Sequence, residues 1–470
     1  METEFVERPP RILPELPIGE EKIPDPPQKN ESGGMDASSL ILPLVSMMGF
    51  MFASGSGNPL AMAPMALIML ASSGAGIFQW LRGRGEFEEK KRKYTILLKE
   101  LRQKMEITHN TQRTFYHHNY PDIETIKEIA HLREKSRFGS RLWERRPSDS
   151  DFGHVRIGIG TRPSTYVFKA EGAADPIDPN QLSKDAEKLM KDSMTVDDVP
   201  ITIPLRPNGP TGPQADMEAN AKKGLPGQPS GPRHAVGIFG KNTSNTADFA
   251  RAMMVNIAAY HAPQDIRIHV LGSPAREKAW QWADWTPHFV IQGDEDPNKP
   301  RPKEQLCFDN DRAKVQAFWK RIKKDLDQRQ VRLRDSGDDS GGGKPDVSLP
   351  FYLVVVDMLG DIPENSPLHD VSSEAVVALA NSSGPTLGIS MVFLSNDSNR
   401  IPSECQAMIE VAAAGDKTIF RYTEVGMNSP RYLGTADQIT ADDARNNFAA
   451  AIRRLELQRP FGADLPRSID

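Results

Sequence analysis

The chain has 470 residues, which is enough for two or three domains. Its formal net charge of −5 argues against a dedicated nucleic-acid-binding protein, although basic residues cluster locally. The two cysteines, Cys307 and Cys405, lie far apart, with no Cys or His at metal-ligand spacing around them. We therefore expect reduced thiols, no disulfide scaffold and no metal site.

Residues 1–36 are mostly polar and rich in proline, so they form an extended strap or a flexible tail. Residues 37–81 contain no charge and are too long for one membrane crossing, which needs about 20 apolar residues. The turn-forming residues 55–59 divide this segment, which predicts two transmembrane helices. The alternatives are a buried hairpin of a soluble protein and a late signal peptide.

Basic residues, among them Arg82, Arg84 and the run 90–93, follow the second predicted crossing, whereas the short loop between the crossings is uncharged. The positive-inside rule then places both termini in the cytoplasm, which makes the chain a two-pass protein of the plasma membrane. Residues 82–140 carry apolar residues at helical spacing, interrupted at Pro121. This pattern predicts a helical stalk, or an ordinary pair of amphipathic helices in a small domain.

The remainder alternates between strand and helix patterns. The pattern of residues 141–205 predicts a small α/β region, with strands at 154–160, 164–170 and 199–205 and a helix at 180–193. Residues 206–233 are rich in Pro and Gly, which predicts a flexible linker or insertion. From 234 to 458, continuously apolar strands such as 350–361 alternate with helices, which is typical of a parallel sheet covered on both faces. The last predicted helix is 441–457, and 459–470 form a tail.

The predicted fold class is therefore α/β: a two-helix transmembrane hairpin, a helical stalk and a cytosolic Rossmann-like or P-loop-NTPase-like domain with a mainly parallel sheet.

The stretch HAVGIFGKNTSNTADF, which starts at His234, is a strand, a polar turn and a helix, the context of a phosphate-binding P-loop. The P-loop motif is G-x-x-x-x-G-K-[ST]. When Gly240 and Lys241 are aligned with its Gly-Lys, Ala235 stands at the first glycine and Asn242 at the Mg²⁺-binding hydroxyl. When Gly240 is taken as the first glycine, the later Gly-Lys pair is missing.

Neither alignment supplies both the glycine nest and a lysine followed by a hydroxyl. Asp357 ends a later strand, but Met358 follows it where an acidic residue would prime an attacking water. We expect a degenerate nucleotide site at Gly240, Lys241, Asn242, Thr243 and Asp357, with no catalytic residue and no certain cofactor. The alternative is a weak ATPase that binds ATP with Mg²⁺ through Lys241, Thr243 and Asp357.

Several segments, in order along nearly the whole chain, resemble the EccC-type FtsK/SpoIIIE membrane ATPases of type VII secretion systems. They are the opening RPPRILPELPIGEEKIPDPP, two membrane segments, LWERRPSDSDFGHVRIGIG, DDVPITIPL, HAVGIFG and WQWADWTPH. The tryptophan array is the most specific of them. Trp280, Trp282, Trp285 and His288 either pack against the sheet edge or form a surface that binds a partner.

The resemblance implies a membrane hairpin, a stalk and a degenerate ATPase-like domain. In the family this domain precedes FtsK-like modules that bind ATP and the signals of WXG100-type substrates, and the present sequence stops about where the first module would start. The resemblance therefore implies either an adaptor that works with a separately encoded FtsK-like motor or a shortened relative. We expect a structural or coupling subunit, oligomeric in the membrane, whose partners are other membrane components, that motor and, indirectly, WXG100-type substrates. A DNA translocase would need a basic channel and working P-loops, and neither is visible, so no nucleic acid is expected.

Overall fold

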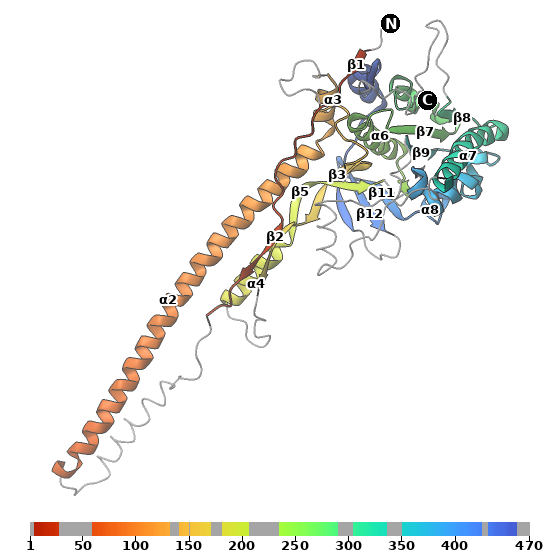
Figure 1. Cartoon of the computed structure of the whole chain (residues 1–470). Helices are drawn as coiled ribbons and strands as arrows, with labels where there is room; N and C mark the ends of the chain where they lie inside the picture. The colour runs from red at the N-terminus through yellow and green to blue at the C-terminus, as the bar shows by residue number, and fades with distance from the viewer. Residues whose placement is uncertain are drawn as a thin grey trace. The chain divides into compact units, whose positions relative to one another are not determined.

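The structure is a computed structural model of the chain (Figure 1), and it describes residues 4–27, 59–131, 141–149, 151–170, 181–205, 235–289, 304–335, 350–424 and 431–457. The chain divides into two compact units. The first, here called the sheet unit, comprises Met1–Leu16, Gln112–Pro163 and Val196–Asp470; the second, the helix unit, comprises Pro17–Thr111 and Ser164–Thr195.

A single long helix, α2 (Pro59–Asn119), contains the second predicted membrane segment and the first part of the predicted stalk. Its opening proline occupies a position where a missing N–H costs nothing, and it ends just before Tyr120 and Pro121 because a residue that precedes proline disfavours the helical conformation. The first predicted membrane segment lies outside the described residues. Within the part of the chain that the structure describes, no helix combines the length and the apolar character that a membrane crossing requires.

The helix unit is a small α/β assembly. Strand β2 (Gly19–Ile23) pairs in parallel with β4 (Tyr166–Ala170), and α4 (Gln181–Ser193) packs nearby. The apolar stripe of α2 covers this assembly, and the joint core consists of Ile23, Tyr94, Leu101, Met105, Phe168, Leu182, Ala186 and Leu189. Within this unit, the predicted stalk stripe is thus the inner face of an amphipathic helix in a small domain.

The sheet unit is built on a ten-stranded sheet with the order β5-β3-β13-β12-β11-β6-β10-β9-β7-β8. Strands β11, β6, β10, β9, β7 and β8 are parallel, which confirms the predicted mainly parallel sheet, and the pairs β11–β12, β12–β13 and β13–β3 are antiparallel. The bounds are β3 (His154–Pro163), β5 (Thr195–Pro204), β6 (Ala235–Phe239), β7 (Ile266–Gly272), β8 (Leu306–Phe308), β9 (Phe351–Met358), β10 (Ile389–Ser395), β11 (Ala407–Ala414), β12 (Lys417–Glu424) and β13 (Tyr432–Ala436).

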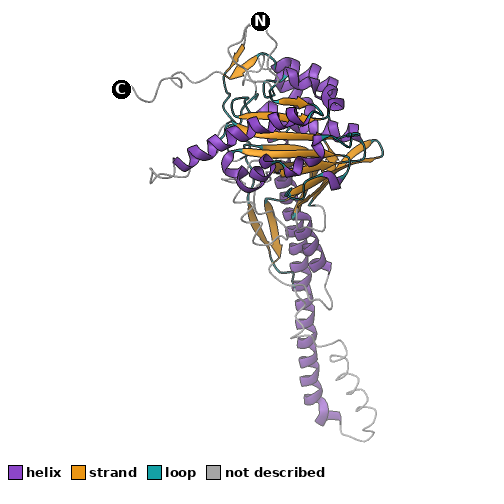
Figure 2. Ribbon diagram, turned by 90° about the vertical axis from the view of Figure 1, so that its right-hand side faces the viewer, coloured by secondary structure: helices purple, strands orange, loops and turns teal. Residues whose placement is uncertain are grey.

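Helices cover both faces of this sheet (Figure 2). One face packs against α3 (Ile123–His131), α6 (Thr243–Tyr260) and the 3-10 helix η2 (Pro274–Trp285), and the other against α7 (Arg312–Asp335), η3 (Pro367–Ser373) and α8 (Ala375–Leu387). Successive side chains of β9 enter the two cores alternately: Leu353 and Val355 enter the first, and Val354 and Val356 enter the second. This double burial is why the strand sequence is continuously apolar.

The last predicted helix, 441–457, is wrong in its last five residues, 453–457. The structure has α9 (Ala441–Asp443), a π-helical segment η5 (Ala444–Ala449) and α10 (Ala450–Ile452), and then a strand, β14 (Leu455–Leu457). Strand β14 pairs in parallel with β1 (Glu4–Val6). The periodic pattern continued through this strand, and only the distant N-terminal segment supplies its partner.

The N-terminal segment is an extended strap on the sheet unit, which was one of the two alternatives for its proline-rich sequence. Beyond β1, Arg11 forms two hydrogen bonds of 2.5 Å to the buried carboxylate of Asp151. Arg8 forms an ion pair of 2.5 Å with Asp265 and donates to the carbonyl oxygen of Arg145. Two arginines separated along an extended chain thus fix the strap by charge-assisted hydrogen bonds.

Candidate functional site

The turn after β6 lies where the direction of the strand connections reverses. Strand β6 pairs with β10 on one side and with β11 on the other. From β6 the chain passes through α6 to β7, on the β10 side, whereas from β10 it passes to β11, on the opposite side of β6. Ligands of open α/β sheets bind outside the carboxyl ends of the strands at such a switch point. Topology therefore selects this turn as the candidate site.

The turn itself consists of Gly240, Lys241 and Asn242, because β6 ends at Phe239 and α6 begins at Thr243. A side chain at Gly240 would overlap the carbonyl oxygen of Val411 and lie 2.5 Å from Thr246 Oγ1. Glycine is thus required here for close packing against β11 and α6. Three residues are too few for the loop of a G-x-x-x-x-G-K-[ST] motif, whose backbone surrounds the phosphates.

Two amides in the first turn of α6, those of Asn245 and Thr246, are bonded within the protein. Asn242 is the N-cap, and its side-chain oxygen accepts from the amide of Asn245 at 3.1 Å. The amide and hydroxyl of Thr246 both donate to the Asn242 carbonyl oxygen. A side-chain cap supplies the hydrogen bond that an anion at a helix N-terminus would otherwise provide.

Asn396, which follows β10, joins three loops at the carboxyl edge of the sheet. Its amide nitrogen donates to the Gly240 carbonyl oxygen at 2.9 Å and lies 3.1 Å from Thr243 Oγ1. Its side-chain oxygen accepts from the amide of Gly360 at 2.6 Å, in the loop after β9. Sequence reasoning missed Asn396. The available signal was its position directly after a buried apolar strand, the same signal that singled out Asp357.

Asp357 is fully buried near the end of β9, in register with Leu394 of β10. One carboxylate oxygen accepts from Arg276 Nε at 2.9 Å and from Trp280 Nε1 at 2.8 Å. The other accepts from the amide of Leu359 at 3.0 Å. Asp357 thus connects β9 to η2, and Arg276 is a second residue of this edge that sequence reasoning missed.

The tryptophan array serves two different purposes. Trp280 and Trp282 are buried and stacked, with ring centroids 6.2 Å apart. His288 is buried as well, and its Nε2 donates to the His261 carbonyl oxygen at 2.7 Å; burial lowers the pKa of His288 to about 4, so the ring is neutral. These three side chains are core packing. Trp285 is half-buried; it packs against the same core and also contacts two arginines.

Asn396 contacts Gly240, the backbone of Lys241 and Thr243, and Asn242 caps α6. Lys241 is an exposed residue in the turn before α6. No group of three or more His, Cys, Asp or Glu side chains placed to hold a metal occurs in the described ranges.

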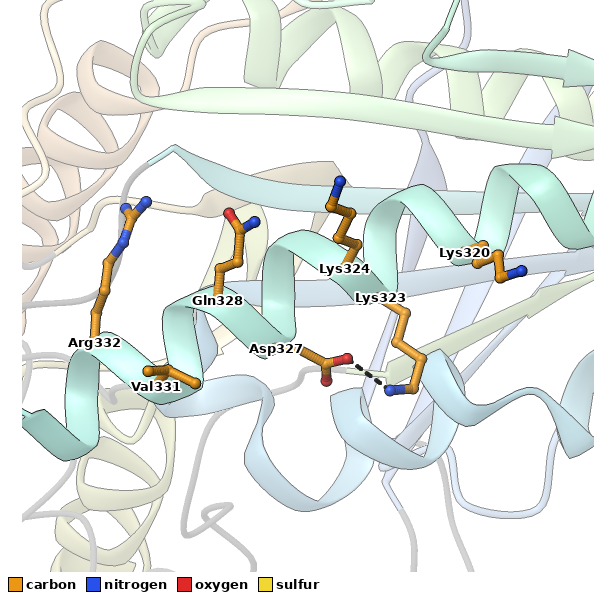
Figure 3. Close-up of a pocket in the computed structure, with 7 residues that line it drawn as sticks. All are labelled: Lys320, Lys323, Lys324, Asp327, Gln328, Val331 and Arg332. Carbon is orange, nitrogen blue, oxygen red and sulfur yellow. Dashed lines mark hydrogen bonds and ion pairs between the residues drawn. The ribbon is translucent and has the colours of Figure 1, made fainter.

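A separate open hollow of about 750 Å³ runs along α7 (Figure 3). The hollow is lined by Lys320, Lys323, Lys324, Asp327, Gln328, Val331 and Arg332.

No family model matches the chain. The ESX secretion system protein EccC of Geobacillus thermodenitrificans is 21% identical over 469 residues, which cover 98% of this chain and 28% of that protein. EccC of Thermomonospora curvata is 27% identical over 290 residues, 60% of this chain and 20% of that protein. The ESX-1 protein EccCa1 of Mycobacterium tuberculosis is 23% identical over 345 residues, 71% of this chain and 38% of that protein.

This chain therefore spans well under half the length of these relatives. Among solved structures, the cytoplasmic domain of the T. curvata type VII secretion ATPase EccC has a TM-score of 0.37 and 11% identity, covering 70% of this chain and 34% of that one. The sequence relatives agree in name and together extend over almost the whole chain. This chain is accordingly a homologue of the EccC proteins of ESX secretion systems, as its sequence motifs predicted.

Proposed function

We propose that this chain is a membrane-anchored structural and coupling subunit of a type VII secretion complex, and that its ATPase-like sheet unit does not hydrolyse ATP. The homology to EccC proteins supports a role in ESX secretion. The uncharged segment 37–81 and the basic residues that follow it support a two-pass anchor with both termini in the cytoplasm.

The hydrogen bonding of Asp357 carries the proposal that the site is degenerate. A nucleotide-hydrolysing site needs a carboxylate that binds the Mg²⁺ shell, but this one accepts from Arg276, Trp280 and Leu359. Releasing it for a metal would leave the half-buried Arg276 guanidinium and the buried Trp280 N–H without their acceptor, which is costly. The residues present therefore do not fit a magnesium–triphosphate.

The turn supports the same proposal. Asn396 joins the Gly240 carbonyl oxygen to the hydroxyl of Thr243, where a working site has a free hydroxyl next to its lysine. The strand–turn–helix unit is retained for its packing, since Gly240 lies against β11 and α6.

The second candidate is a weak ATP-binding subunit, and the exposure of Lys241 beside Thr243 favours it. Titration of the purified full chain with Mg²⁺–ATP in a calorimeter, together with phosphate release, separates the two. We expect no saturable binding and no phosphate release above that of Lys241→Ala. Magnesium-dependent turnover that Lys241→Ala abolishes would overturn the degenerate site and establish the ATPase.

The partners follow from the same proposal: other membrane components of the secretion complex, a separately encoded FtsK-like motor ATPase and, through it, WXG100-type substrates. Purification of the tagged chain from its own membranes, with mass spectrometry, tests this set. A DNA-translocating complex would instead show salt-dependent DNA binding by the chain.

A further inference from the structure

Trp285, at the end of η2, contacts two arginines from the C-terminal helical segments. The guanidinium carbons of Arg445, in η5, and Arg453, which follows α10, each lie 4.6 Å from the indole centroid. Trp285 and Arg445 are half-buried and Arg453 is exposed. This set, here called the Trp285 cluster, therefore presents two cations on one aromatic side chain at the surface of the sheet unit.

Neither arginine forms an ion pair with a carboxylate of the described residues, in contrast to Arg276, Arg251 and Arg156 in the same unit. Two like charges held against one ring repel each other unless an anion lies between or beside them. Their contacts with the indole hold them together in the isolated chain. Arg445 and Arg453 are thus placed to bind an anion, and no carboxylate of the described residues fills that place.

The geometry of the guanidinium group defines the chemistry of that ligand. When the plane of the group stacks on an aromatic ring, its N–H edge remains available for a bidentate bond with a carboxylate. Acidic side chains three or four positions apart on a helix lie about 5–6 Å from each other, a spacing suited to two neighbouring guanidinium groups. Tryptophan and arginine are also the residues most often found at the centres of protein interfaces.

The segment that carries Arg445 is fixed by core packing and by an ion pair. Segment η5 is π-helical, a geometry that occurs frequently at functional sites, and it buries Ala444, Phe448 and Ala449 in the core. Asp443, just before it, forms an ion pair of 3.0 Å with Lys127 of α3. The arginines therefore project from a rigid surface, which reduces the conformational entropy lost on binding.

We propose that Trp285, Arg445 and Arg453 form a docking site for a carboxylate-rich peptide segment of a partner protein. Two cations on a tryptophan suit a short acidic segment better than a membrane, because anionic lipid surfaces are usually bound by clusters of about four to eight basic residues. The site is distinct from the turn at Gly240, and its use does not depend on whether that turn binds nucleotide.

Fluorescence anisotropy with the full chain and a labelled helical peptide, carrying Glu at every third and fourth position, tests the proposal. The key variant is Arg445→Gln with Arg453→Gln, and the matched control is Lys320→Gln with Lys324→Gln, which removes the same charge from the exposed side of α7. We expect the first pair to weaken binding at least about tenfold and the α7 pair less than about threefold. A peptide with Gln in place of Glu should not bind.

Trp285→Leu keeps both charges and removes the indole ring that they contact, and we expect it also to weaken binding severalfold in a chain that circular dichroism shows to be folded. Equal losses in the two double variants would show non-specific charge attraction and overturn the proposal. Binding to vesicles with phosphatidylglycerol, but not to the peptide, with the same dependence on Arg445 and Arg453, would assign the cluster to lipid and overturn it as well.

Discussion

Asp357 shows how one residue changes role when its neighbours change. It is the next-to-last residue of the buried strand β9 at the carboxyl edge of a parallel sheet, where a metal-binding aspartate of a nucleotide site is expected. Its hydrogen bonds to Arg276 and Trp280 instead make it the link between the sheet and η2. The tryptophan signature and this aspartate therefore belong to one structural feature.

The first prediction concerns this ion pair. Arg276→Ala removes the ion-pair partner of the fully buried Asp357 carboxylate. We therefore expect the free energy of unfolding to fall by about 3–5 kcal/mol, measured by chaotrope titration. The double variant Arg276→Ala with Asp357→Asn should recover part of this loss, because the buried charge is then gone. A single variant as stable as the wild type would contradict the structural role of the pair.

The second prediction concerns His269 and the dependence of stability on pH. It is buried against the rings of Tyr352 and Phe318, and neither of its ring nitrogens has a hydrogen-bond partner in the described residues. Burial, with the nearby Arg267 and Arg329, lowers the pKa of His269 to about 3, against about 6.5 in the unfolded chain. Between these two pH values the imidazole is protonated in the unfolded state and neutral in the folded state. The free energy of unfolding therefore falls as pH decreases from about 6.5 toward 3.

His269→Leu removes this penalty. We expect the variant to raise the unfolding temperature more at pH 5 than at pH 8, measured by scanning fluorimetry. The exposed His369→Gln serves as the control and should show no such difference. An equal shift for His269→Leu at the two pH values would exclude the proton linkage and leave only a packing effect.

At the scale of elements, the strand–turn–helix unit β6–α6 survives because each part of the turn has a packing or hydrogen-bonding partner. Gly240 contacts β11 and α6, Asn242 caps the helix, and Asn396 fixes the turn to the next strand. Loss of nucleotide binding therefore does not require loss of the turn.

Gly240→Ala is the third prediction. The added methyl group meets a backbone oxygen and Thr246 Oγ1, so we expect a destabilisation of about 1–3 kcal/mol without any nucleotide present. In Gly85→Ala, the new methyl group has nothing within 4 Å and lies in a helix, which predicts a neutral or stabilising effect of up to about 1 kcal/mol. If Gly240→Ala lost no stability, close packing could not be the reason for glycine in the turn.

The strap is the second element with a testable anchor. Burial opposes ionisation of Asp151, but Arg145 and the hydrogen bonds from Arg11 outweigh it and keep the pKa of Asp151 well below its ordinary value. A carboxyl group with a lowered pKa adds stability above its unfolded pKa, about 3.9, and this stability is lost as pH falls through the folded value.

The fourth prediction is that Arg11→Gln speeds amide hydrogen exchange in β1 and lowers stability by about 2 kcal/mol at pH 7, with a smaller effect at pH 3. Arg332→Gln, an exposed change on α7, should leave exchange in β1 unaltered. Unchanged exchange in Arg11→Gln would mean that the pairing of β1 with β14 alone holds the strap.

At the scale of the whole molecule, the fifth prediction follows from a non-hydrolysing subunit. Lys241→Ala should support normal export by the type VII complex and normal assembly in the membrane, because the proposed role needs the fold and the interfaces rather than nucleotide turnover. Secretion of a substrate, measured with chain levels checked by immunoblot, decides it. Export lost at a normal level of the chain would favour the weak-ATPase alternative.

The sequence by itself determined the α/β class and most strands of the parallel sheet, because buried strands and amphipathic helices leave local periodic patterns. The resemblance to EccC came from its motifs, above all the tryptophan array. The sequence also located the turn at Gly240 and showed that its motif was incomplete. Only the tertiary structure decided that β14 replaces the end of the last predicted helix, because its partner β1 lies at the other end of the sequence.

The contacts of Asp357, the bonds of Asn396 and the separation of Trp285 from Trp280 and Trp282 are likewise tertiary facts. Each depends on side chains brought together from distant segments, and no local pattern records which donor reaches which acceptor.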